Sequence, residues 1–149
     1  MKKHKVKIFA AVLVVLTIAA AMLHLNLRDA AAEGSLQMIV RDQSISLDIS
    51  KFDYQQVSGI RMNGKGEEIP VEGLGVAIKD VLAQAKVNEY ELVRVISDDS
   101  YSAEISAEEV ADSTKAFLLL DEENELRLVV FGDTNSKRSV SNVVQIVVE

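Results

Sequence analysis

The segment spanning residues 73–96 constrains the fold more than any other part of the chain. Its first half places apolar residues at the i, i+3, i+4 and i+7 spacing that gathers side chains on one stripe of a helix. The residues at these positions are Ile78, Val81, Leu82 and Ala85. The second half, residues 92–96, is short and mostly β-branched, which predicts a largely buried strand. We therefore expect the helical stripe to dock onto a sheet built from the Leu92 and Leu126 segments.

More strands are predicted on both sides of this segment. Residues 44–49 and 101–106 alternate polar and apolar side chains, which is the pattern of a strand with one face in water. Other apolar or alternating runs predict strands over residues 36–40, 57–62, 67–72, 116–120, 126–131 and 143–148. The acidic segment 121–125 would then be a loop between two strands.

Turn and capping residues separate these strands. Residues 42–43 are expected to form a turn, and the Asn-Gly pair at 63–64 favours a tight hairpin turn. Pro70 has no backbone N–H, so it restricts its strand to an edge position. Residues 106–109 match the capping box, in which a serine and a glutamate cap each other's backbone, and they predict a short helix through Ala111.

The composition suits one folded domain behind a leader. The chain has 149 residues, of which 48% are hydrophobic and 26% are charged. We expect residues 33–149 to form a mixed α+β domain, with a mixed, barrel-like sheet of about eight strands, one main helix and one short helix. An N-terminal membrane-targeting helix is expected to precede it.

Residues 1–32 are expected to be a signal peptide or signal anchor with a linker. Basic residues precede an apolar run over residues 8–23, and this order is typical of a targeting segment. Two outcomes stay open, because cleavage after Ala30–Ala32 would secrete the domain, whereas retention of residues 8–25 would anchor it to the cytoplasmic membrane. The lysines before the run favour a cytoplasmic amino terminus and an extracytoplasmic domain in either case.

The residue types of the domain narrow its function. From Glu33 onward there are 11 basic and 22 acidic residues, a net charge of 11 − 22 = −11, which argues against nucleic-acid binding. The chain has no cysteine, and its two histidines, His4 and His24, lie in or beside the leader. Thiolate metal sites, disulfides and imidazole-assisted catalysis are therefore not expected. These absences argue against an enzyme but do not exclude one.

Acidic residues cluster at 98–99 and 121–125. Clustered carboxylates could bind calcium or serve in glycoside hydrolysis. Neither run has the spacing of a calcium-binding loop, and acidic runs between strands are ordinarily solvated turns. We expect no metal site in either segment.

Several segments resemble the oxidoreductase molybdopterin-binding domain, the fold of sulfite oxidases and their bacterial relatives. The matching segments are residues 75–82, 97–101, 126–130 and Lys137-Arg138 with residues 143–146. The likeness covers about two thirds of the chain, residues 55–149. Ser100 stands where the hairpin glycine of the family is usual, and Ser139 where a tryptophan commonly follows the arginine.

The resemblance implies a fold and a possible cofactor. Enzymes of the family hold molybdenum through a cysteine thiolate, which this chain lacks, and a serine does not replace a thiolate at a soft metal. No cofactor is therefore expected, and molybdopterin is implied by the resemblance alone. If the resemblance extends to cofactor binding, the Tyr101 hydroxyl would contact the pterin cofactor, and Lys137 and Arg138 would bind its phosphate group.

Three function classes follow from these observations. The first is an extracytoplasmic, non-catalytic binding or interaction module for an unknown protein or small-molecule ligand at the cell envelope. The second is a pterin-cofactor-binding component of an extracytoplasmic oxidoreductase system. The third is a structural domain that exposes an edge strand for pairing.

Overall fold

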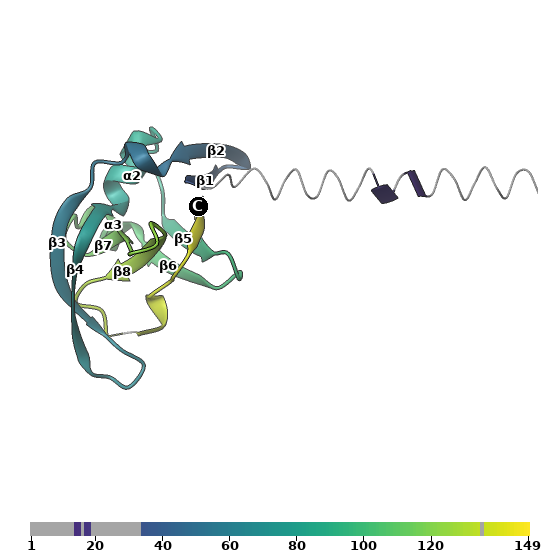
Figure 1. Ribbon diagram of the computed structural model, residues 1–149. Coiled ribbons are helices and arrows are strands. Elements are labelled where there is room, and N and C mark those ends of the chain that lie inside the picture. Colours follow the sequence, from purple (N-terminus) through teal and green to yellow (C-terminus); the bar gives the residue numbers. More distant parts are fainter. Residues whose placement is uncertain (1–13, 16, 19–33, 135) are drawn as a thin grey trace, which may run out of the picture. The chain divides into compact units, whose positions relative to one another are not determined.

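The computed structural model describes residues 14–15, 17–18, 34–134 and 136–149 (Figure 1). The expected membrane segment, residues 8–25, therefore lies mostly outside the described residues. Residues 14–15 and 17–18 are helical. In the described part of the chain, no helix is long and apolar enough to cross a membrane. The membrane-targeting helix stays a prediction.

Residues 34–149 form one compact unit of mixed α+β structure, as the sequence predicts. Nine strands and two α-helices are present in its described part, with two short 3-10 helices (η). In chain order these are β1 (Ser35–Val40), β2 (Gln43–Asp48), η1 (Ile49–Lys51), β3 (Gln55–Met62), β4 (Glu68–Ala77), α2 (Ile78–Gln84), β5 (Leu92–Ser97), β6 (Ser102–Ser106), α3 (Ala107–Ala111), β7 (Ala116–Leu120), β8 (Leu126–Val130), η2 (Ser136–Arg138) and β9 (Val143–Val148).

The strands divide between two sheets. One has the order β2-β1-β9-β5-β6, and the other has the order β3-β4-β7-β8. Strands β1 and β9 are parallel, whereas the other paired neighbours are antiparallel. The expectation that the Leu92 and Leu126 segments share a sheet is wrong, because β5 pairs with β6 and β9 while β8 pairs with β7. Strand β5 forms a hairpin with β6, and β8 forms a hairpin with β7. These two hairpins belong to different sheets.

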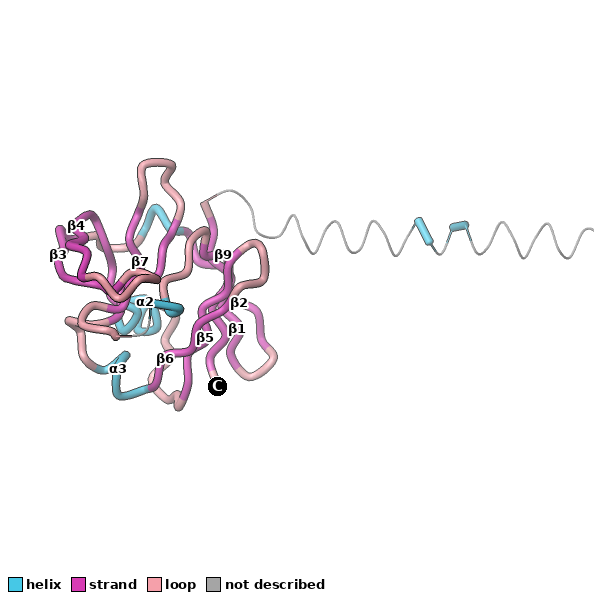
Figure 2. Tube along the Cα trace, turned by 90° about the horizontal axis from the view of Figure 1, so that it is seen from below, coloured by secondary structure: helices cyan, strands magenta, loops and turns pink. Residues whose placement is uncertain are grey.

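The main core lies between the two sheets, with α2 beside it. Figure 2 shows β3, β4 and β7 on one side, β1, β2, β5, β6 and β9 on the other, and α2 between them. The stripe predicted from the sequence is confirmed, since Ile78, Val81 and Leu82 are buried in this core. Ala85 is partly buried against the same cluster. The helix contacts β4 and β7 of the four-stranded sheet.

The four-stranded sheet bends back on itself. Gly132, just after β8, donates its backbone N–H to the carbonyl oxygen of Ile60 in β3 at 2.9 Å, although these strands are the two edges of the sheet. Gly59 of β3 lies against the ring of Phe131, and a side chain at position 59 would overlap that ring. A second apolar cluster, Leu119, Val129 and Phe131, fills the inside of the bend.

The first hairpin turn differs by one residue from the sequence expectation. Val40 pairs with Gln43, so the turn consists of Arg41 and Asp42 rather than Asp42 and Gln43. Both turn residues have positive φ, 47° and 67°, which is typical of the type I′ turn found in two-residue hairpins. The alternation of side chains along a strand shows which residues share a face, but it does not show at which residue the strand begins. The turn before β2 could therefore be misplaced by one residue.

The second hairpin is present, but without the tight Asn-Gly turn. Met62 pairs with Glu68, so residues 63–67 form the loop, and Gly66, rather than Asn63 or Gly64, takes a positive φ, 78°. The Asn63 side chain accepts backbone hydrogen bonds from Lys65 and Glu67.

Two other local predictions are confirmed. Pro70 lies in the part of β4 that pairs with β3 alone, since β7 pairs only with residues 75–77. At the start of α3, Ser106 and Glu109 form the predicted capping box, with the Glu109 N–H donating to Ser106 Oγ at 3.3 Å.

Candidate functional site

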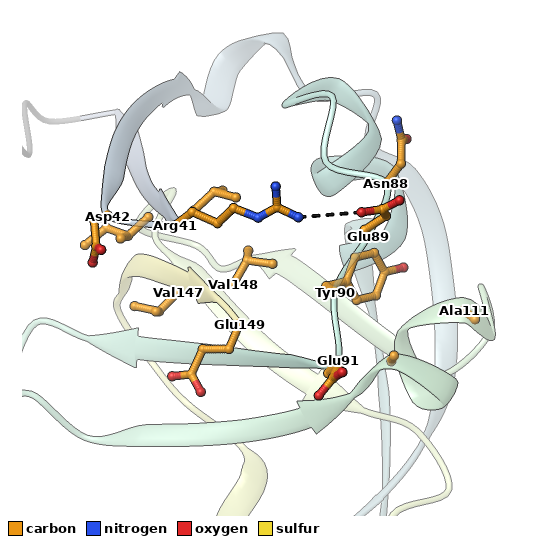
Figure 3. Close-up of a pocket in the computed structure, with 13 residues that line it drawn as sticks. Arg41, Asp42, Asn88, Glu89, Tyr90, Glu91, Ala111, Val147, Val148 and Glu149 are labelled. Atoms are coloured by element: carbon orange, nitrogen blue, oxygen red, sulfur yellow. Dashed lines mark ion pairs between the residues drawn. The ribbon is translucent and has the colours of Figure 1, made fainter.

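An open groove of about 900 Å³ lies at the end of β1 (Figure 3). Its lining comes mainly from segments far apart in the sequence, residues 39–42, 88–91 and 147–149. Apolar side chains form part of the lining, among them the buried Val148 and the half-buried Tyr90. The groove thus joins an apolar surface to several charged groups.

The groove has an excess of carboxylates. Asp42, Glu89, Glu91 and Glu149 line it and are exposed, whereas Arg41 is the cation among its lining residues. Glu149 Oε1 also lies 3.2 Å from Arg94 Nη1, which neutralises part of this charge.

An ion pair spans the groove between Arg41 of the β1–β2 turn and Glu89 of the loop before β5 (Figure 3). Arg41 Nη2 lies 3.5 Å from Glu89 Oε2, and the two side chains are 81% and 87% exposed. An ion pair this exposed contributes between about 0 and 1 kcal/mol, so it opens at little cost.

A second groove, of about 560 Å³, shares Arg41 and Glu89 with the first. It is lined on one side by Gln43 and Ile45 of β2 and on the other by residues 85–87, which follow α2. Because both grooves include the Arg41–Glu89 pair, that pair lies where the two meet.

The end of α2 positions the loop that forms one wall. Lys86 has φ 59°, the Lys86 N–H donates to the Ala83 carbonyl oxygen at 3.0 Å, and the Val87 N–H donates to the Leu82 carbonyl oxygen at 2.9 Å. A left-handed residue at this place ends a helix and redirects the chain. The N–H groups of Glu91 and Leu92 then donate to the Glu149 carbonyl oxygen at 2.7 and 3.1 Å, which fixes the loop beside β9.

The structure brings the three predicted cofactor-binding residues together at a different place. Tyr101, before β6, donates its hydroxyl proton to the backbone carbonyl oxygen of Lys137 in η2. Arg138, the next residue, donates from Nε to Asp133 Oδ2 at 2.7 Å and from Nη1 and Nη2 to the two carboxylate oxygens of Glu109.

These contacts determine the electrostatics of the cluster. The hydrogen bonds from Arg138 lower the pKa of Glu109 to about 2, although burial acts in the opposite direction. The hydrogen bonds to Asp133 and Glu109 raise the pKa of Arg138 above its ordinary value. An anionic ligand would have to compete with two carboxylates for this guanidinium. Pterin binding by Tyr101, Lys137 and Arg138 stays a prediction.

The acidic segments form turns. Asp99 accepts a hydrogen bond from the Tyr101 N–H at 3.0 Å, and Asp121 accepts from the N–H groups of Glu123 and Glu125, both at 2.9 Å. No cluster of three or more histidine, aspartate or glutamate side chains that could hold a metal is found in the described ranges.

The groove is the feature that sequence analysis missed. Its three segments carry no shared motif, and only the folded sheet places the end of β1 beside the end of β9. The presence of an arginine at a turn position that favours glycine or asparagine was the one local signal. It becomes visible only once the turn is placed at residues 41–42.

Comparisons with known proteins give no match, either to a model of a protein family or to a curated protein.

Proposed function

We propose that the chain is an extracytoplasmic, non-catalytic interaction module that binds a partner in the groove at the end of β1. The single observation that carries this proposal is the groove itself, with apolar lining, exposed carboxylates and a weak ion pair across it. Such a surface suits recognition, because apolar contacts supply affinity and a few polar groups fix orientation.

The leader supports the proposed location. Its basic residues precede the apolar run, so retention of residues 8–25 would hold the domain outside the cytoplasm. Gly34, where the leader joins the domain, precedes β1, whereas the groove lies at the other end of that strand.

The proposal also includes a barrel-like closure of the four-stranded sheet, which the Gly132–Ile60 hydrogen bond supports.

Site-specific photo-crosslinking in the host cell tests this function. A photoreactive residue is placed at Asn88 in the groove, and at Ser58, an exposed residue of β3, as the matched control. We expect the Asn88 probe to crosslink one identifiable partner that the Ser58 probe does not, and protease added outside the membrane to degrade the domain. A domain protected from that protease, or equal adducts from both probes, would contradict the proposal.

A second candidate is a pterin-binding component of an oxidoreductase system. The observation that favours it is the meeting of Tyr101, Lys137 and Arg138 in one cluster. The residues present do not fit a molybdenum centre, because the chain has no thiolate and Arg138 is bonded to two carboxylates. Pterin fluorescence in protein purified from its host would favour this candidate, and its absence would count against it.

A further inference from the structure

Strand β2 lies at one edge of the five-stranded sheet. Among the described strands it pairs with β1 alone, so alternate peptide groups of β2 point away from the sheet. Val40 and Gln43 flank a two-residue turn and form a hydrogen-bonded pair in such hairpins, and the alternation then directs the peptide groups of Ser44 and Ser46 outward. Among the described strands, none pairs with these groups, so another strand can bind there.

The β2 edge has little of the usual protection against pairing. Proteins block exposed edges with charged residues, prolines or bulges; residues 43–47 contain none of these, and Asp48 at the end of the strand is its one charged residue. The β6 edge of the same sheet carries Glu104, which is paired with Arg94. The β8 edge of the other sheet is bridged through Leu128 to Val140.

A groove lies on one face of β2, next to the edge. The 560 Å³ groove has Gln43 and Ile45 of β2 on one side and residues 85–87 on the other. Gln43 and Ile45 share one face of β2, so the side chains of an added strand that point to this face would reach into the groove. Past the Arg41–Glu89 pair the groove continues into the larger one at the end of β1.

We propose that an extended, basic peptide segment of a partner protein binds here by adding a strand to β2. This inference rests on the proposed interaction function and names its partner class. Backbone hydrogen bonds to β2 would supply affinity, as in other cases of strand addition. A lysine or arginine of the partner would lie over the carboxylates that line the joined grooves, which are Asp42, Glu89, Glu91 and Glu149.

Charge complementarity selects a basic partner. The cations that line the joined grooves are Arg41 and Lys86, against four carboxylates, and Arg41 is paired with Glu89. The domain as a whole carries 11 basic and 22 acidic residues from Glu33 onward. A basic segment would be attracted by this field and would displace Arg41 from a weak pair.

The test uses the full chain purified in detergent micelles and a defined peptide probe. The probe is a synthetic peptide in which valine and threonine alternate between terminal lysines, and its two controls carry glutamate in place of lysine or N-methyl groups on alternate peptide nitrogens. We expect the basic peptide to bind at least about tenfold more tightly than either control, because each control removes one of the two recognition elements. Hydrogen exchange should slow at Ser44 and Ser46 when the basic peptide is bound.

Two variants locate the site. Ser46→Pro removes an outward N–H of β2 and should weaken binding at least about tenfold, whereas the matched Ser102→Pro on the β6 edge should change it less than about twofold. Circular dichroism checks that both proline variants fold. A third variant, Glu89→Gln, leaves the backbone intact and removes one carboxylate of the groove. It should weaken binding of the basic peptide and reduce the salt dependence of that binding.

The proposal is overturned if the basic peptide does not bind, if basic and N-methylated peptides bind equally, or if Ser102→Pro acts like Ser46→Pro. A partner crosslinked through Asn88 in the cell, together with failure of all these peptides, would leave the interaction function standing and reject strand addition.

Discussion

Arg138 and Glu109 face each other through two parallel hydrogen bonds, from Nη1 to Oε2 at 2.9 Å and from Nη2 to Oε1 at 2.7 Å. The side chains are 21% and 26% exposed, so water screens this pair less than the surface ion pairs. Glu109 also caps α3 through Ser106. One carboxylate therefore connects η2 to the start of a helix that lies 29 residues earlier in the chain.

Loss of this connection should destabilise the domain. Arg138→Ala leaves Glu109 and Asp133 without their main partner, and we expect it to lower the free energy of unfolding by about 2 kcal/mol. Urea denaturation measures the change. The matched control is Lys115→Ala, which removes an exposed pair with Asp112 and should have an effect below about 0.5 kcal/mol. Equal effects of the two variants would contradict this account.

The same pair should make stability depend on pH. The pKa of Glu109 is about 2 in the folded protein, against an ordinary value of 4.5, because Arg138 favours its charged form. A lowered pKa stabilises the fold fully above pH 4.5, and this stabilisation is lost as the pH falls towards 2. Melting temperatures measured across this range should fall less steeply in Glu109→Gln than in the unaltered protein. Parallel curves would show that Glu109 does not contribute.

The contact between Gly59 and Phe131 predicts a steric effect. A Cβ at position 59 would lie 2.5 Å from Cγ of the Phe131 ring, which is buried, so Gly59→Ala should destabilise the domain by about 1–3 kcal/mol. Gly64→Ala serves as the control, because a Cβ there meets no atom within 4 Å. Thermal denaturation should separate the two variants. If Phe131→Leu fails to restore part of the loss in Gly59→Ala, the cause is not the ring.

Two left-handed residues should accept glycine with a gain in stability. Lys86 has φ 59° and Ser100 has φ 70°, a region that favours glycine over residues with a side chain. Lys86→Gly and Ser100→Gly should each raise the free energy of unfolding by about 1 kcal/mol. Ala83→Gly, inside α2, should instead lower it by about 1 kcal/mol. A loss of stability in the first two variants would show that their side chains matter more than the backbone.

Local features of the fold could be predicted from the sequence because neighbouring residues determine them. The helical stripe containing Ile78 and Val81, the capping box at Ser106 and the hairpin after Met62 each follow from periodicity or from a few adjacent residues. Ser100 adopts the left-handed conformation at the hairpin position where the resembled family has glycine. This conformation belongs to the turn and leaves the family resemblance an untested prediction.

Long-range arrangements could not be predicted in the same way. Nothing in residues 92–96 or 126–130 indicates that these strands enter different sheets, because both are short runs of aliphatic residues with one arginine. The groove likewise depends on the pairing of β1 with β9, whose sequences say nothing of each other. The pairing of Arg138 with Glu109 also joins distant segments that share no motif.

Strand β9 lies between β1 and β5, so the β1–β2 and β5–β6 hairpins join into one sheet only when β9 is in place. During synthesis, the growing polypeptide therefore reaches the ribosomal exit with its first hairpin still lacking a neighbour on one side. The sheet is complete only after segments far apart in the sequence have paired, and pairing over such separations slows folding.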